Sequence, residues 1–314
     1  MKHVTFAYNP DNGRIYQEGG DFPGLVGEQS YRQDTYSLSI AERLANPTDR
    51  NAGWRQEYAY CGPMGKVQPK HPDFVGWTWD SLRHIFWMVP GTMEISSAGN
   101  CPGETFSRIS DPAFLLNHIM TFDPTAQEWT DRSTNIGLDP AETWQSVYDP
   151  VTDTIIRFGF NGGSGAVANI YTISTNSWIR LGLGVNALGQ DIRLNKEGVT
   201  VDLANRFIYA VDGFRGRLHR FNMATKKMED LGGVPGGANI SGSTNDAYVA
   251  WNSNDNILYF FRLENSKLYI YHPDTKTWES PAMTTNPTGL NVAMRHAMVF
   301  DPANNVLVIM GGVD

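Results

Sequence analysis

The chain has 314 residues and a formal net charge of −8, with 25 Lys and Arg against 33 Asp and Glu. Aromatic residues make up 12% and charged residues only 18%, which is not the composition of a disordered chain. The acidic balance argues against a nucleic-acid partner, because such proteins need a basic surface. A chain of this length can bury a sizeable core, and we expect a single domain over residues 1–314.

The first residues do not resemble a targeting signal. The apolar stretch 4–8 is too short for a signal-peptide core and is followed by Pro10. The most apolar run, 85–89, has the length of a strand and is far below the ~20 residues of a spanning helix. We therefore expect no signal peptide or membrane insertion, and a protein that is either cytoplasmic or assembled into a virion.

One sequence pattern occurs six times along the chain. It consists of an aromatic residue or Val, then Asp or Asn, two or three turn-forming residues, and an apolar run. Val, Ile, Tyr and Phe favour strands, and Asp or Asn favours the tight turn between them. Each copy thus predicts a hairpin of a first and a second strand. The Asp or Asn positions are Asn9, Asp80, Asp149, Asp202, Asn252 and Asp301.

A second pattern lies between copies of the first. An apolar strand leads into a turn with Thr, and a Trp or Met follows three or four residues later. The Thr residues are evenly spaced, at Thr125, Thr175, Thr225 and Thr275. A degenerate first copy covers residues 35–38 and is closed by Trp54 after a longer turn. Five copies therefore predict five hairpins of a third and a fourth strand.

Two hairpins in each repeat form a four-stranded antiparallel sheet, and helical periodicity is nearly absent. Such a sheet cannot bury both faces alone, whereas repeated sheets packed around an axis can, as in a β-propeller. The repeats resemble kelch repeats of the galactose-oxidase-like propeller superfamily. The double glycine is matched at Gly19-Gly20 and Gly311-Gly312 and only partly at Asp212-Gly213, and Phe261-Arg262 departs from it. The later Trp is matched by Trp54, Trp129, Trp178 and Trp278.

The fold we expect is an all-β, six-bladed kelch-like propeller with four-stranded antiparallel blades. Because the first hairpin occurs six times and the second only five, the last blade is expected to be incomplete within this chain. An unfinished blade has an unpaired edge, which favours an oligomer or a larger assembly. The expected blades cover residues 1–57, 73–132, 144–182, 197–232, 245–281 and 295–314.

Long connections are expected on one face of the propeller, which we call the long-loop face. In a meander, the second–third and fourth–first connections emerge at the same end, and here they are long and irregular. Loops on a rigid scaffold often carry binding residues. Arg and His at such a face could hold a sugar carboxylate or another anion. The candidate ligand-binding residues are His71, Arg108, Arg215, Arg217, Arg295 and His296.

The sequence contains few signs of a catalytic, metal or cofactor site. The seven His form no HExxH or His-x-His motif, and no phosphate loop, serine elbow or cofactor motif is present. A copper site like that of galactose oxidase would need a Tyr–Cys crosslink and two His ligands. Cys61 and Cys101 are both expected on the long-loop face, where a disulfide between them is possible and two reduced thiols are the alternative. We assign no catalytic residue, metal or cofactor, and interpret Trp77, Trp79, Trp87 and Trp251 as core.

We interpret the chain as a non-enzymatic recognition or assembly module that binds a protein or glycan through the long-loop face. A standalone propeller with abundant Gly and few charges resembles a virus-particle component, such as a phage attachment or decoration protein. One alternative is a carbohydrate-active enzyme, such as a polysaccharide lyase or another glycan-processing propeller. The other is a cytosolic kelch adaptor, which would have a stable protein partner.

Overall fold

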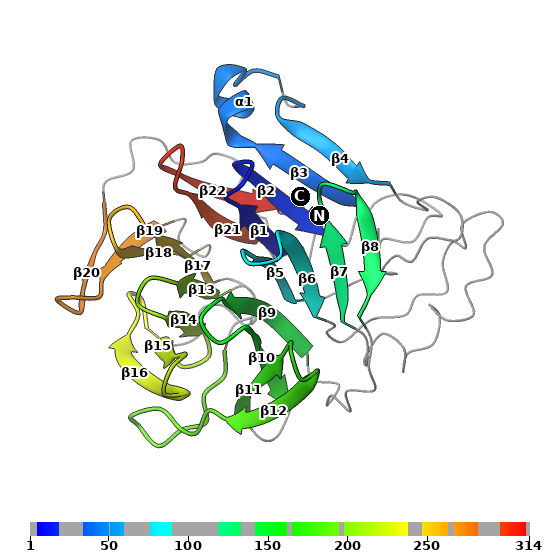
Figure 1. Cartoon of the computed structure of the whole chain (residues 1–314). Helices are drawn as coiled ribbons and strands as arrows, with labels where there is room; N and C mark the ends of the chain where they lie inside the picture. The colour runs from blue at the N-terminus through cyan, green and yellow to red at the C-terminus, as the bar shows by residue number, and fades with distance from the viewer. Residues whose placement is uncertain are drawn as a thin grey trace, which may run out of the picture.

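The structure is a computed structural model that describes residues 5–18, 34–49, 51–59, 76–89, 119–132, 142–161, 165–194, 198–237, 247–262, 267–281 and 296–311. These residues form six antiparallel sheets around a central axis (Figure 1). In the first five sheets, four strands pair in chain order as a meander. The expectation of an all-β propeller with four-stranded antiparallel blades is therefore confirmed.

The first three sheets are called blades 1, 2 and 3. Blade 1 contains β1 (Thr5–Asn9), β2 (Arg14–Glu18), β3 (Thr35–Ser39) and β4 (Trp54–Tyr58). Blade 2 contains β5 (Gly76–Asp80), β6 (Ile85–Val89), β7 (Met120–Asp123) and β8 (Glu128–Asp131). Blade 3 contains β9 (Glu142–Asp149), β10 (Thr154–Asn161), β11 (Gly165–Thr172) and β12 (Ser177–Gly182).

The remaining sheets are blades 4 and 5 and the smaller sheet 6. Blade 4 contains β13 (Val199–Asp202), β14 (Phe207–Asp212), β15 (Arg217–Asn222) and β16 (Lys227–Gly233). Blade 5 contains β17 (Ala247–Asn252), β18 (Ile257–Arg262), β19 (Lys267–His272) and β20 (Thr277–Glu279). Sheet 6 contains only β21 (His296–Asp301) and β22 (Val306–Gly311).

The expectation of six blades is corrected to five blades and a small sixth sheet. Five sheets have four strands, and the sixth is a two-stranded hairpin. The reason is in the sequence: the hairpin of third and fourth strands occurs five times, and the first hairpin six times. The structure is therefore a propeller of five complete blades with a small sixth sheet.

Sheet 6 closes the ring by side-chain packing. The first strands lie innermost, and β21 contacts both β17 of blade 5 and β1 of blade 1 (Figure 1). On the blade 5 side, Met298 and Phe300 are buried together with Tyr248 and Phe261. On the blade 1 side, Val299, Val306 and Val308 pack against buried Ile15, Leu38 and Ile40. The burial of apolar surface on both sides of sheet 6 thus holds the two ends of the chain together.

The turn chemistry predicted for the first hairpins is present in all six. In each turn, the side-chain oxygen of the repeated Asp or Asn accepts a hydrogen bond from a backbone N–H two or three residues later. The residue that ends each turn has a positive φ, for example 65° at Gly13 and 51° at Asp153. The repeated carboxylates and amides are 0 to 2% exposed. They therefore fix six similar turns at one end of the ring, which we call the short-turn face.

The core is divided among the interfaces between neighbouring blades. One cluster joins blades 3 and 4 through Phe158, Ile170, Ile208 and Phe221. Four Trp residues were interpreted as core. Three of them are buried: Trp77, Trp87 and Trp251. The fourth, Trp79, is half-buried and packs against the cluster that contains Trp77. Trp77 stacks on Phe86 with ring centroids 4.7 Å apart.

One element was not expected from the sequence. The connection between β3 and β4 contains a short helix, α1 (Ile40–Ala45). Ser39 caps it, since its hydroxyl accepts a hydrogen bond from the backbone N–H of Glu42 at 3.2 Å. At six residues, α1 is too short for a periodicity to stand out, and among the described residues no helix has the length and apolar character to cross a membrane.

Candidate functional site

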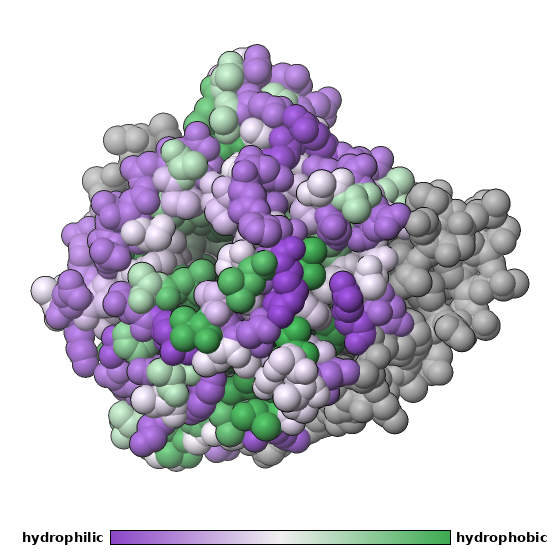
Figure 2. Space-filling view, viewed as in Figure 1, coloured by the Kyte–Doolittle hydropathy of each residue, from purple (hydrophilic) through white to green (hydrophobic). Residues whose placement is uncertain are grey.

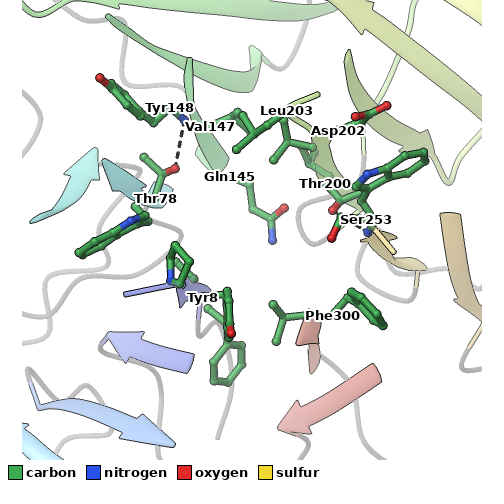
Figure 3. A pocket seen from close by; sticks show the side chains of 18 of the residues that line it. Tyr8, Thr78, Gln145, Val147, Tyr148, Thr200, Asp202, Leu203, Ser253 and Phe300 are labelled. Carbon is green, nitrogen blue, oxygen red and sulfur yellow. Dashed lines mark hydrogen bonds between the residues drawn. The ribbon is translucent and has the colours of Figure 1, made fainter. Parts of the chain in front are cut away.

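A pocket of about 520 Å³ lies at the axis of the propeller. Its wall is made by the first strands of all six sheets and by the turns that follow them, including Pro10, Ser81, Leu203, Ser253 and Pro302. Those turns form the short-turn face, so the pocket lies toward that end of the ring. Apolar side chains gather around the centre of the face in Figure 2. Figure 3 shows lining residues of several strands arranged around one space, with Gln145 pointing into it.

One position of the repeat supplies much of this wall. The residue immediately before the turn Asp or Asn lines the pocket in every sheet. It is aromatic in five of the six copies, and successive copies come from neighbouring inner strands. These residues are Tyr8, Trp79, Tyr148, Val201, Trp251 and Phe300.

Hydrogen bonds between neighbouring blades hold the wall in place. Thr78 Oγ1 accepts a hydrogen bond from the backbone N–H of Tyr148 at 3.1 Å, which Figure 3 marks. In the same way, Thr200 Oγ1 accepts from the backbone N–H of Trp251 at 3.0 Å. The two Thr residues occupy the same position of the repeat, two residues before the turn Asp. Each therefore ties the inner strand of its own blade to that of the next.

The rim of the pocket is held by polar contacts between successive short turns. His84 Nδ1 of blade 2 contacts Asp11 Oδ2 of blade 1. Asp149 of blade 3 accepts from Arg206 Nη2 of blade 4 at 2.5 Å, and this partner lowers the carboxyl pKa despite burial, which acts to raise it. The Asn254 side-chain amide donates to the Pro302 carbonyl at 3.0 Å. These contacts give the pocket a preformed mouth.

One polar side chain of the wall is available to a ligand. The Gln145 side chain points into the middle of the pocket (Figure 3), and no hydrogen bond joins its amide to any other part of the described chain. The Ser146 hydroxyl and the Trp79 indole N–H also lack a hydrogen-bond partner within the described ranges, but both atoms are buried away from solvent. The Gln145 amide can both donate to and accept from a ligand in the pocket.

The wall of the axial pocket carries almost no charge. No Lys, Arg or His is among the described residues that line the pocket, and Asp202 is the single carboxylate among them. That carboxylate accepts a hydrogen bond from the Asn205 amide at 2.8 Å. Burial, with a smaller contribution from Asp301, raises the pKa of Tyr8 to about 12, so this phenol stays neutral at ordinary pH. The pocket therefore suits a neutral ligand with both apolar and polar faces.

The candidate residues of the long-loop face are only partly described. Arg215 and Arg217 lie at the turn between β14 and β15, at the end of blade 4 opposite the short turns. Arg217 Nε donates to Asp230 Oδ2 at 2.7 Å, and this partner lowers the Asp230 pKa although burial acts to raise it. His296 is the first residue of β21. His71, Arg108 and Arg295 lie outside the described residues, as do Cys61 and Cys101, so the predicted site on that face stays a prediction.

The parts of the chain that the structure describes contain no cluster of three His, Cys, Asp or Glu side chains able to bind a metal ion.

The axial pocket was not predicted from the sequence. Its signal was nevertheless present, since the repeat itself begins with the aromatic residue that lines the pocket. That residue was interpreted only as part of a strand, because its neighbours in space lie some 50 to 70 residues away in the chain.

Comparisons with known proteins support the fold. No family model and no curated protein matches this chain. A solved nidogen/laminin complex contains a chain with a TM-score of 0.51 at 12% identity, covering 89% of this chain and 80% of that one. An auxiliary nutrient binding protein from Bacteroides thetaiotaomicron VPI-5482 has a TM-score of 0.55 at 12% identity, covering 98% of this chain and 66% of that one. At this identity the likeness shows the propeller fold alone, and the kelch resemblance rests on the sequence motifs.

Proposed function

We propose that this protein is a non-enzymatic binding module whose axial pocket holds a neutral glycan, with one sugar ring inside the ring of inner strands. The observation that carries the proposal is the Gln145 amide, which points into a pocket lined mostly by apolar residues, with an aromatic residue from five of the six inner strands. Sugar rings have apolar faces that pack on aromatic rings and hydroxyl groups that both donate to and accept from an amide.

The architecture of the pocket supports this proposal. Ligand sites are concave and mostly apolar, with a few placed polar groups, and typically measure about 300–1,000 Å³. The axial pocket has that volume and that kind of wall. Its lining strands are tied together by Thr78 and Thr200, so little ordering is needed when a ligand enters. One structural neighbour is named as a nutrient binding protein, which agrees with a binding role for the shared fold.

A glycan screen followed by calorimetry tests the proposal. We expect neutral glycans to bind the wild-type protein, and the Gln145→Ala variant to bind them about tenfold more weakly, through the loss of hydrogen bonds from the amide. Gln190→Ala is the matched control, because Gln190 is exposed on the connection after β12, away from the pocket. Equal binding by all three proteins would contradict a site at Gln145.

Several alternatives drawn from the sequence stand beside this proposal. Glycan or protein binding through the long-loop face would depend on His71, Arg108, Arg215, Arg217, Arg295 and His296. A virion role, a carbohydrate-active enzyme and a cytosolic adaptor are separate hypotheses. Glycan cleavage that is lost in His296→Ala would favour the enzyme, and a stable protein partner without glycan binding would favour the adaptor.

A further inference from the structure

The inner strands direct backbone N–H groups toward the axis of the ring. The Tyr148 N–H bonds to Thr78 of the preceding blade, and the Trp251 N–H bonds to Thr200 in the same way. Along an antiparallel strand, residues alternate between bonding to the partner strand and pointing away from it. Val201 has the same place in the register of β13 and β14, one residue before the turn Asp. Because β13 is the innermost strand of its blade, the Val201 N–H points away from β14 and toward the axis.

The Val201 N–H differs from these two counterparts because the preceding blade has no acceptor for it. Thr78 and Thr200 lie two residues before the turn Asp of their blades, and in blade 3 this position is Val147. Val147 packs in the same cluster as Val201 and has no side-chain oxygen. Among the residues that the structure describes, no side chain accepts a hydrogen bond from the Val201 N–H. Since Val201 lines the axial pocket, this donor is left for a ligand.

The wall around this donor is aliphatic. β13 and the turn that follows it contribute Val199, Val201 and Leu203 to the lining of the pocket. Val201 is also the single non-aromatic residue among the six that precede the short turns. The neighbouring inner strand, β9, carries Gln145, whose amide points into the pocket (Figure 3). This part of the wall therefore combines a backbone donor, an amide oxygen that can accept, and apolar surface.

We propose that the sugar in the axial pocket carries an acetamido group, which lies against β13. This inference rests on the proposed glycan site and names its substrate class, the neutral N-acetylated glycans. The acetamido carbonyl accepts from the Val201 N–H, and the acetamido N–H donates to the side-chain oxygen of Gln145. The methyl group packs on Val199 and Leu203, and its burial is favourable. A hydroxyl at the same place has no methyl group to cover these aliphatic side chains.

Matched sugars test the proposal on the wild-type protein. Trisaccharides of N-acetylglucosamine and of N-acetylgalactosamine are each compared by calorimetry with the trisaccharide that has a hydroxyl in place of every acetamido group. In at least one of the two pairs, we expect the acetylated sugar to bind about tenfold more tightly or better. Equal affinities within each pair, or glycan binding in the wider screen without binding of either acetylated sugar, would overturn the acetamido inference and leave the glycan site standing. A screen with no glycan ligand at all would overturn both.

Amide hydrogen exchange tests the donor itself and needs no variant. In the free protein, we expect the Val201 amide to exchange faster than the amides of Tyr148 and Trp251, which already donate to Thr side chains. The acetylated trisaccharide should slow exchange at Val201 and leave the two counterparts unchanged. Exchange at Val201 in the free protein as slow as at Tyr148 and Trp251 would show that its N–H already has a partner, and would overturn the proposal.

Variants locate the acetamido group. Val147→Thr adds the hydroxyl that blades 2 and 4 already have at this position, where it can accept from the Val201 N–H, and should weaken binding of the acetylated sugar about tenfold. Leu203→Ser removes an apolar contact and should weaken it about threefold or more. Because Leu203 is 48% exposed, this variant keeps the test valid if Val147→Thr fails to fold.

Val151→Ser is the matched control for Leu203→Ser. Val151 is an aliphatic residue of the neighbouring short turn, is 66% exposed and is not among the described residues that line the pocket. Its variant should bind the acetylated sugar as tightly as the wild type does. An unchanged preference for the acetylated sugar in both Val147→Thr and Leu203→Ser would overturn the proposal.

Discussion

Arg83 Nη2 lies 2.6 Å from Asp153 Oδ2 and joins the short turn of blade 2 to that of blade 3. The same guanidinium donates to Asp80 Oδ2, at 2.8 Å, within its own turn. The hydrogen bond from Arg83 holds the pKa of Asp153 below its usual value. This pair therefore stabilises an interface between blades at the rim of the axial pocket.

The pair predicts a defined pH dependence. A carboxyl whose folded pKa is below its unfolded value adds stability above the unfolded pKa of about 3.9, and loses it as the pH falls through the folded pKa. Asp153→Asn removes the charge and keeps a side chain that tolerates the positive φ of this position. We expect the variant to lose about 0.5–1 kcal/mol of unfolding free energy near neutral pH, because the pair is partly exposed.

Urea unfolding at neutral and acidic pH measures this effect. The difference between wild type and Asp153→Asn should shrink toward zero as the pH falls below the folded pKa. Arg83→Gln serves as the second arm of a double-mutant cycle, and the two changes together should cost less than the sum of each alone. Additive losses would contradict a direct interaction.

The buried His219 predicts a second pH dependence of stability, at a higher pH than that of Asp153. It is fully buried in β15, neither ring nitrogen has a hydrogen-bond partner among the described residues, and burial lowers its pKa to about 4. Asp230 acts in the opposite direction and Arg217 in the same direction. Between the folded pKa and the unfolded value of about 6.5, the unfolded chain binds more protons, so stability falls as the pH decreases through this range.

His219→Leu should remove that dependence. The substitution replaces an unpaired polar ring by an apolar side chain, so we expect little loss of stability near neutral pH. Toward pH 4 the variant should be more stable than wild type, by up to about 3 kcal/mol. Thermal unfolding across this range is the measurement, and parallel profiles for the two proteins would show that His219 does not titrate as described.

The contacts of Asp80 predict how much a short turn contributes to the free energy of unfolding. Its buried carboxylate accepts from the backbone N–H groups of Leu82 and Arg83 and from the Trp87 indole, at 2.9, 3.0 and 2.9 Å. Asp80→Ala leaves these donors without a partner, and we expect a loss of about 3 kcal/mol. Asp123 makes similar backbone contacts at an outer turn that is more exposed, so Asp123→Ala should cost about 1 kcal/mol. Equal losses in denaturant unfolding would contradict this ranking.

Thr78 predicts how firmly inner strands are joined around the pocket. Thr78→Val keeps the shape of the side chain and removes the acceptor for the Tyr148 N–H, which should cost about 1 kcal/mol. Thr78→Ser restores the hydroxyl and should recover most of that loss. Unfolding free energies of the three proteins test this, and a serine variant no better than valine would assign the effect to the methyl group instead.

The sequence was sufficient for the fold because the fold is repetitive. The turn at Asp149 could be predicted, since Asp, Pro and an apolar run at that spacing define a hairpin locally, and five further copies repeat it. The helix α1 could not be predicted from the sequence. It is a single short segment, and its cap at Ser39 has no counterpart in the other repeats. The propeller therefore follows from local chemistry and repetition.

The candidate site was less predictable for a physical reason. The pocket exists only where six inner strands meet, and Gln145 belongs to one strand of one blade. Nothing local distinguishes Gln145 from a solvated strand residue. The residue before each turn was visible in the sequence, but its place in the pocket wall depends on the closure of the ring.

Tryptophan fluorescence during glycan titration tests the central claim most directly, because Trp79 and Trp251 line the axial pocket. We compare the wild type with Gln145→Trp, which fills the pocket from a half-buried position, and with the control Gln190→Ala. We predict that a neutral glycan produces a saturable fluorescence change in the wild type and in the control. We predict that calorimetry detects no glycan binding by Gln145→Trp. Undiminished calorimetric binding by Gln145→Trp would contradict a glycan site at the axis.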